Sequence, residues 1–394
     1  MPAFFIAVKD YFKKYDAVFW ITSLFMSSYC LVLMFSVSRS GTDFFKNQAT
    51  AIIFGYIGAV FLGELDYHLL EKHWKITAIL CMGFLLYALF FGIAIEGASG
   101  VNAKAWIKLP GVTFQPSELA KIGFIITLAT HLNYLKKNNL MKSFGQIMLL
   151  GGHLVIPVVI SHFQGDDGAA IIFVCIFLVV CFMAGIQMRY FIGVFLSIFM
   201  IIPIAWRFVL SEYQKKRITA LINLEDYALD IGFQQIQGKI SIGSGKIFGY
   251  GLFKGPRTGC DIVPVQESDF IFSAAGEELG FIGCMLVVIS LLVLIFRTLK
   301  IARDSCDSLG SYMCFGFFGL VLFQTIFNIG MCLSLLPVMG LTLPFYSSGG
   351  SSAMCLYLGL GVVQSVFSRK TDGDMVTLDK NIIVLSEKQK DQNP

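Results

Sequence analysis

Residues 270–297 read FIFSAAGEELGFIGCMLVVISLLVLIFR, and this stretch decides the class of protein. After Glu278 no charged residue occurs until Arg297, so the apolar run is long enough for a helix to cross ~30 Å of hydrocarbon. The run is continuous rather than alternating, which favours a helix over a strand of a β-barrel. The stretch therefore predicts a transmembrane helix.

The composition extends this conclusion to the whole chain. Of the 394 residues, 56% are hydrophobic and only 14% are charged, and the mean hydropathy is +0.73. A soluble domain has about 25% charged residues, so these charges cannot cover a soluble fold of this length. The same numbers exclude a disordered, collagen-like or disulfide-rich secreted chain. A net charge of +4 is too small for a nucleic-acid-binding protein.

We expect an all-α membrane protein, a polytopic bundle of about ten transmembrane helices. The spans are predicted at residues 18–38, 46–64, 76–95, 117–135, 147–163, 168–185, 191–210, 270–297, 311–334 and 345–368. Lysine and arginine cluster before the first span, in two alternate loops and after the last span. By the positive-inside rule, both termini are expected in the cytoplasm. No cleavable signal peptide is expected.

This orientation places a large outer loop, residues 211–269, between the seventh and eighth helices. The loop carries equal numbers of acidic and basic residues, and a polar loop over a helical bundle is a common place for binding or chemistry. Residues 1–370 are interpreted as one transmembrane domain, and the polar residues 371–394 as a flexible cytoplasmic tail.

Two patterns in the sequence suggest known kinds of binding site but do not meet the spacing that these sites require. Residues 243–246 (GSGK) suggest a phosphate-binding loop, but Ile247 follows the lysine and the leading glycine spacing is wrong. The five histidines show neither the HExxH spacing nor paired cysteines, so a zinc site is not expected. The glycines of residues 243–255 are expected to form tight turns.

Two charged residues at the expected outer edge of the membrane are the most informative. Lys121 lies about one turn inside the fourth span, where a buried ammonium costs several kcal/mol unless it has a partner or a task. An ion pair with Glu118 and a functional role are both open. Asp269 directly precedes the eighth span, where it is either a helix cap or a general base made more basic by the apolar wall.

Other polar residues at this edge of the membrane have either a structural or a functional role. Glu277 and Glu278, about two turns deeper, are expected to anchor helix contacts rather than to line a cavity. Asp166 and Asp167 are either solvated turn residues or part of a site. Residues 347–352, which are all small, permit close approach of a helix or a ligand.

Together these residues resemble one family, the SEDS proteins (shape, elongation, division and sporulation), which include the RodA and FtsW polymerases of bacterial cell walls. The resemblance covers about residues 20–368 and is closer to the RodA-type, elongation branch. It rests on residues 103–107 (AKAWI), 114–121 (FQPSELAK), 164–168 (QGDDG), Gln214 with Arg217, 242–245 (IGSG), 269–272 (DFIF), 276–280 (GEELG), 328–331 (NIGM), 335–337 (LLP), 343–344 (LP) and 349–352 (GGSS).

The resemblance implies a peptidoglycan glycosyltransferase that polymerises lipid II at the outer face of the bacterial cytoplasmic (inner) membrane. Asp269 is the implied catalytic base. The implied substrate-binding residues are Lys121, Trp106, Glu118, Gln115, Asp166, Arg217, Asp261 and Ser351. The leaving diphosphate needs positive charge, either from Lys121 or from Mg²⁺ or Mn²⁺ held by Asp269 and Asp261. No organic cofactor and no nucleic acid is expected. The implied partners are a class B penicillin-binding protein and the elongation or division machinery.

Several positions depart from the family pattern. Ala105 and Thr113 stand where relatives usually carry arginine, Ser348 replaces a tyrosine, and Glu267-Ser268 replaces His-Thr. Two cations are thus missing from the first outer segment. The departures keep two alternatives open, a flippase or transporter of the lipid-linked precursor and a scaffold for the penicillin-binding protein.

Overall fold

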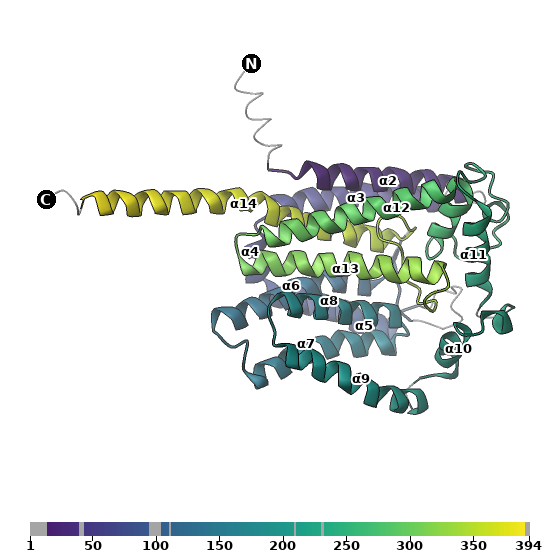
Figure 1. Ribbon diagram of the computed structural model, residues 1–394, viewed down its shortest axis with the longest axis horizontal. Coiled ribbons are helices and arrows are strands. Elements are labelled where there is room, and N and C mark those ends of the chain that lie inside the picture. The colour runs from purple at the N-terminus through teal and green to yellow at the C-terminus, as the bar shows by residue number, and fades with distance from the viewer. Residues whose placement is uncertain are drawn as a thin grey trace, which may run out of the picture.

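The computed structural model describes residues 14–38, 43–93, 104–109, 112–208, 210–229 and 232–390 (Figure 1). Within them, ten long helices coincide with the ten predicted spans, which confirms the helical membrane bundle. They are α2 (Ala17–Val37), α3 (Asp43–Glu64), α5 (Trp74–Phe91), α6 (Pro116–Lys137), α7 (Phe144–Phe163), α8 (Asp167–Met183), α9 (Met188–Phe208), α12 (Ile271–Arg303), α13 (Ser308–Cys332) and α14 (Gly350–Lys390).

Short elements lie at the ends of the bundle. They are α4 (Tyr67–Lys72), β1 (Ile107–Leu109), β2 (Val112–Phe114), α10 (Glu212–Ala220), the 3₁₀ helices η1 (Leu224–Tyr227) and η2 (Thr258–Cys260), and α11 (Phe233–Ser244). Helices α10 and α11 lie across the end of the bundle opposite to the one from which α14 leaves (Figure 1). The segment between α9 and α12 therefore forms a structured cap rather than an open loop.

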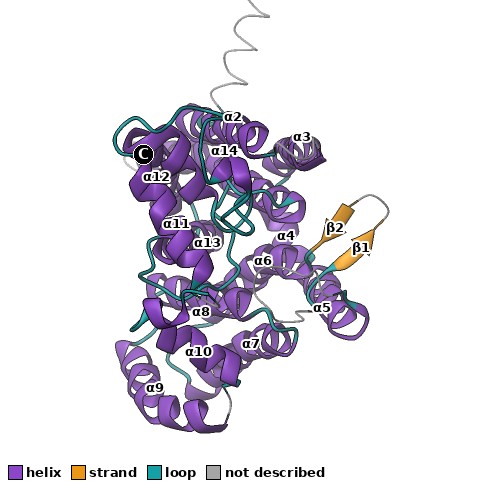
Figure 2. Ribbon diagram, turned by 90° about the vertical axis from the view of Figure 1, so that its right-hand side faces the viewer, coloured by secondary structure: helices purple, strands orange, loops and turns teal. Residues whose placement is uncertain are grey.

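Helix α13 is the centre of the bundle, since it packs against α12, α8, α6 and α14. Eight helices of the described chain are long and apolar enough to cross a membrane alone, but α6 is not among them because it carries several charged and polar side chains. These side chains are tolerated because α6 is buried by protein on nearly all sides. Helix α9 is the opposite case: its apolar stretch is unburied and lies at the edge of the molecule (Figure 2).

Helix α12 is broken at Gly280, whose backbone (φ 67°, ψ −161°) is not helical. The turn after α11 fills the break: Phe281 N donates to Lys246 O at 2.8 Å, and Gly251 N donates to Glu278 O at 2.9 Å. Backbone groups freed at membrane depth need such partners. The break corrects the sequence interpretation of 270–297 as one continuous helix, and it ties the long segment between α9 and α12 to the bundle.

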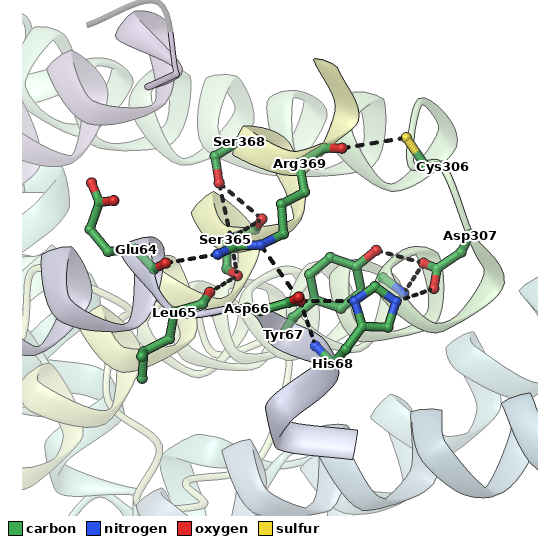
Figure 3. A network of polar contacts seen from close by, with 11 residues as sticks. Glu64, Leu65, Asp66, Tyr67, His68, Cys306, Asp307, Ser365, Ser368 and Arg369 are labelled. Carbon is green, nitrogen blue, oxygen red and sulfur yellow. Dashed lines mark hydrogen bonds and ion pairs between the residues drawn. The ribbon is translucent and has the colours of Figure 1, made fainter. Parts of the chain in front are cut away.

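At the other end of the bundle, a polar network holds the last turns of the α14 span (Figure 3). The ring of His68 lies between two carboxylates, 2.8 Å from Asp66 Oδ1 and 3.1 Å from Asp307 Oδ2. Arg369 donates to Glu64 O at 2.7 Å and lies 3.5 Å from Asp66. The network joins α3, α4, the α12–α13 turn and α14.

Beyond this network the backbone of α14 projects from the bundle as a helix to Lys390 (Figure 1). The flexibility expected for the tail after Lys370 stays a prediction.

Candidate functional site

Asp269 lies at the N-terminal end of α12, where its backbone is fixed by α13. Its carbonyl oxygen accepts hydrogen bonds from Asn328 Nδ2 at 2.9 Å and from the Cys332 thiol at 3.6 Å, both on α13. The N-cap residue of α12 is Phe270, and no side chain caps this helix end. The Asp269 carboxylate is therefore not engaged as a helix cap, and it stays partly exposed.

The surroundings of Asp269 make its carboxylate more basic. Removal from water raises its pKa to about 6, and the neighbouring Glu267 acts in the same direction. The Ser268 hydroxyl and the charge of Arg217 oppose this rise without cancelling it. A carboxylate with this pKa is ionised at neutral pH and accepts a proton more readily than an ordinary aspartate does, which suits a general base.

The α13–α14 loop, residues 333–349, holds the segment that carries Asp269. Ser347 donates through its hydroxyl to Ser268 O, and Ser348 N donates to Glu267 O at 2.7 Å. A Cβ added to Gly340 would lie 3.9 Å from Asp269 Oδ2, so a residue without a side chain faces the carboxylate. Arg217 of α10 is bound to the same loop, where its Nη1 donates to Val338 O at 2.9 Å.

A second polar cluster joins the N-terminal ends of α6, α8 and α14. Asp166 Oδ2 accepts from Gln115 Nε2 at 2.9 Å and from the Ser117 hydroxyl at 2.8 Å, while Oδ1 caps α8 through Ala169 N. Gln115 N donates to Ser351 Oγ at 3.2 Å. Gln115 therefore contacts two other predicted site residues, Asp166 and Ser351, although the three lie far apart in the sequence.

Lys121 and Glu118 form the ion pair that their spacing permits. Lys121 Nζ lies 2.8 Å from Glu118 Oε1, and the side chains are only 1% and 8% exposed. The Lys121 ammonium is thus enclosed one turn below the second cluster, and its role as a substrate-binding residue stays a prediction. Its position supports a role in holding α6 and the residues above it.

The α13–α14 loop also connects the Asp269 region to the second cluster. Thr342 Oγ1 lies 3.1 Å from Ser352 Oγ. A Cβ on Gly168 would lie 2.5 Å from Met339 O, so the start of α8 packs against the loop backbone. One loop therefore contacts both groups of predicted site residues.

Two predicted site residues lie apart from these groups. Asp261 is exposed at the end of η2, where its Oδ1 accepts from Gln266 Nε2 at 2.8 Å. The carbonyl oxygen of Trp106 accepts a hydrogen bond from Ile93 N at 2.8 Å. Trp106 directly precedes the hairpin of β1 and β2, which lies at one side of the bundle (Figure 2). None of the contacts in the described residues joins Asp261 or Trp106 to Asp269.

The described residues contain no group of three or more His, Cys, Asp or Glu side chains that could hold a metal ion. The two carboxylates expected to bind Mg²⁺ or Mn²⁺, Asp269 and Asp261, do not form a site by themselves. Binding of Mg²⁺ or Mn²⁺ stays a prediction.

Glu277 has a role that its local sequence does not signal. Its carboxylate is fully buried and accepts hydrogen bonds from Arg257 N at 2.7 Å, Thr258 N at 3.1 Å and Thr258 Oγ1 at 3.0 Å. The expected helix–helix anchor is thus an anchor for the outer segment. No signal in the sequence around Glu277 identifies partners that lie nineteen and twenty residues upstream.

Comparison with known proteins shows the family to which the chain belongs. The model of the FtsW/RodA/SpoVE family, described as cell cycle protein, matches residues 13–372. The chain belongs to this family. It is 32% identical to a probable peptidoglycan glycosyltransferase FtsW of Geobacter sp. (strain M18), over 91% of this chain and 98% of that protein. It is 30% identical to the peptidoglycan glycosyltransferase MrdB of Escherichia coli (strain K12), over 90% of this chain and 94% of that protein.

Solved structures of the FtsW/RodA/SpoVE family share the fold. A chain from a study of how a peptidoglycan synthase complex coordinates polymerisation and crosslinking matches with a TM-score of 0.76 at 26% identity, over 90% of this chain and 98% of that chain. The rod shape determining protein RodA of Thermus thermophilus matches with a TM-score of 0.67 at 24% identity, over 90% of this chain and 97% of that chain. The latter likeness concerns the fold alone.

Proposed function

We propose that this chain is a peptidoglycan glycosyltransferase that polymerises lipid II, with Asp269 as the general base. The observation that carries the proposal is a partly exposed carboxylate, with a pKa of about 6, held at the outer end of a membrane helix. Membership of a family whose relatives are named peptidoglycan glycosyltransferases supports the reaction class.

In the proposed reaction, Asp269 accepts the proton of the acceptor sugar's 4-hydroxyl. The hydroxyl oxygen forms a bond to the anomeric carbon of the donor, with inversion, while the bond from that carbon to the diphosphate oxygen breaks. Undecaprenyl pyrophosphate leaves with the electron pair. Arg217 is the described cation whose charge acts on Asp269, so we assign to it the stabilisation of the leaving diphosphate.

Lys121 and the second cluster have a positioning role in this proposal. The buried Lys121–Glu118 pair fixes the first turns of α6, and Gln115, Asp166 and Ser351 bind the outer ends of three helices together. The starts of α8 and α14 in turn contact the α13–α14 loop, which lies beside Asp269. Asp261 and Trp106 would contact parts of the lipid-linked sugar more distant from the reacting atoms.

We further propose that both termini are cytoplasmic and that Asp269 faces the outside. Two naturally exposed cysteines allow a direct test, since Cys260 lies in η2, in the segment between α11 and α12, and Cys306 lies in the α12–α13 turn at the other end of the bundle. A membrane-impermeant maleimide should label Cys260 in intact spheroplasts, and Cys306 only after permeabilisation. The reverse pattern would overturn the orientation.

A class B penicillin-binding protein is the proposed partner. The matching structure from a complex that coordinates polymerisation and crosslinking supports it. Relatives named FtsW and MrdB match this chain at similar identity, so the closer likeness to the elongation branch stays a prediction.

The deciding experiment is a lipid II polymerisation assay of the purified chain with its partner in detergent. We expect the wild type to form glycan strands and the Asp261→Asn variant to form them at a lower rate. A folded Asp269→Asn variant should form none. Full activity of the Asp269→Asn variant would refute the assignment of Asp269 as the general base. Transfer of lipid II across vesicle membranes without polymer would favour a transporter, and partner binding without either activity would favour a scaffold.

A further inference from the structure

A groove runs between α2 and α12 at the end of the bundle from which α14 leaves. Its volume is about 400 Å³, and its walls are apolar side chains that include Val18 of α2 and Leu292, Val293 and Phe296 of α12. These four side chains are between 37% and 62% exposed, so the groove opens outward, toward the hydrocarbon of the membrane. Its apolar walls suit an acyl chain.

The groove ends at two cations in the last turns of α12, Arg297 and Lys300. Arg297 is already neutralised, since its Nε and its Nη2 both lie 2.5 Å from Oδ2 of the buried Asp16. Lys300 is exposed, and in the described part of the chain it makes no direct hydrogen bond or ion pair, although its charge acts on Asp304. Lys300, Arg297 and Lys370 face two carboxylates, Asp16 and Asp304, so the groove leads to a net positive charge with Lys300 as its exposed ammonium.

A second, polar pocket of about 180 Å³ continues from the same two cations. It is lined by Asp304, Ser305 and Lys370 among others. Lys370 Nζ is paired with Asp304 Oδ2 at 2.8 Å, so this pocket adds hydrogen-bonding groups without adding net charge. The surface thus changes from the apolar groove, through the exposed Lys300 ammonium, to the polar pocket.

We propose that this surface binds an anionic phospholipid, with an acyl chain in the groove, the phosphate at Lys300 and the polar headgroup in the second pocket. The order of the three parts matches the order of apolar, charged and polar parts in such a lipid. Basic pockets between helices at the membrane surface are typical binding sites for anionic headgroups. A partner helix would use the apolar walls but would leave the cation and the polar pocket without a function.

The test is native mass spectrometry of the full chain in detergent, titrated with phosphatidylglycerol or with phosphatidylethanolamine. We expect the wild type to prefer phosphatidylglycerol, and Lys300→Gln to weaken its binding about fivefold. The matched control is Lys142→Gln, which removes another exposed lysine at the same end of the bundle, and it should leave binding unchanged. Equal affinity for both lipids, or equal losses in both variants, would overturn the proposal.

A photoreactive amino acid at Phe296 tests the occupant in native membranes. The side chain is 62% exposed in the groove wall, so the replacement does not disturb the core. We expect crosslinks to lipid that decrease when Lys300→Gln is added. A crosslink to a protein of defined mass instead would assign the groove to a partner chain and overturn the lipid site.

Discussion

Replacing Asp269 by asparagine is expected to remove activity and, at the same time, to stabilise the folded protein above pH 6. The reason is the desolvation that raises the pKa of this carboxyl from 3.8 to about 6. A raised pKa means that folding favours the protonated form of the acid, so the ionised form destabilises the folded state. Asparagine keeps the shape of the side chain and carries no charge.

The size of the effect follows from the shift of about two pH units. One unit corresponds to about 1.4 kcal/mol, so ionised Asp269 lowers the free energy of unfolding by about 3 kcal/mol at pH 8. The penalty is complete above pH 6 and is lost as the pH falls toward 3.8, with about 1 kcal/mol left at pH 4.5. The stabilisation of Asp269→Asn should therefore shrink as the pH falls.

The assay is thermal unfolding in detergent, followed by tryptophan fluorescence at pH 4.5, 6 and 8. Asp269→Asn should melt several degrees above the wild type at pH 8, and the difference should be smallest at pH 4.5. Asp261→Asn, which removes an exposed carboxylate from the same outer segment, is the control and should show no such trend. In the wild type, polymerisation should fall about tenfold per pH unit below pH 6. Equal melting temperatures of Asp269→Asn and wild type at pH 8 would refute the reasoning.

Three further substitutions test the framework of the site. Gly280→Ala, which places a Cβ 2.4 Å from a backbone nitrogen at φ 67°, should speed proteolysis of the outer segment, whereas Gly243→Ala, with nothing within 4 Å, should not. Lys121→Met should lower stability by about 3–5 kcal/mol by leaving Glu118 unpaired. A double variant with Glu118→Gln should recover the melting temperature; continued instability would show that the pair is not the cause. Glu277→Gln should cost about 1.5–3 kcal/mol and slow polymerisation without moving its pH midpoint; a shifted midpoint would contradict a purely anchoring role.

Several features of this protein are readable from local sequence. Hydropathy predicts most of the spans because burial in hydrocarbon depends on the composition of each segment; α6 is the exception, since protein buries its charged and polar side chains. Asp269 and Lys121 stand out for the same reason, since a charge in an apolar segment is costly and therefore rare. The pair of Lys121 with Glu118 is also predictable, because its members lie one helical turn apart.

Other features depend on contacts between distant segments, which only the tertiary structure reveals. Helix α12 breaks at Gly280 because the turn after α11 supplies hydrogen-bond partners for the backbone groups of Glu278 and Phe281. The pKa of Asp269 depends on Arg217, about fifty residues away, and on the protein packed around it.

The sequence by itself therefore determined the membrane class, the spans and the candidate base, while the tertiary structure decided how that base is held and how basic it is. The reason is that the hydropathy of a segment is the sum of contributions from its own residues. Desolvation and hydrogen-bond partners, in contrast, depend on which segments meet in space.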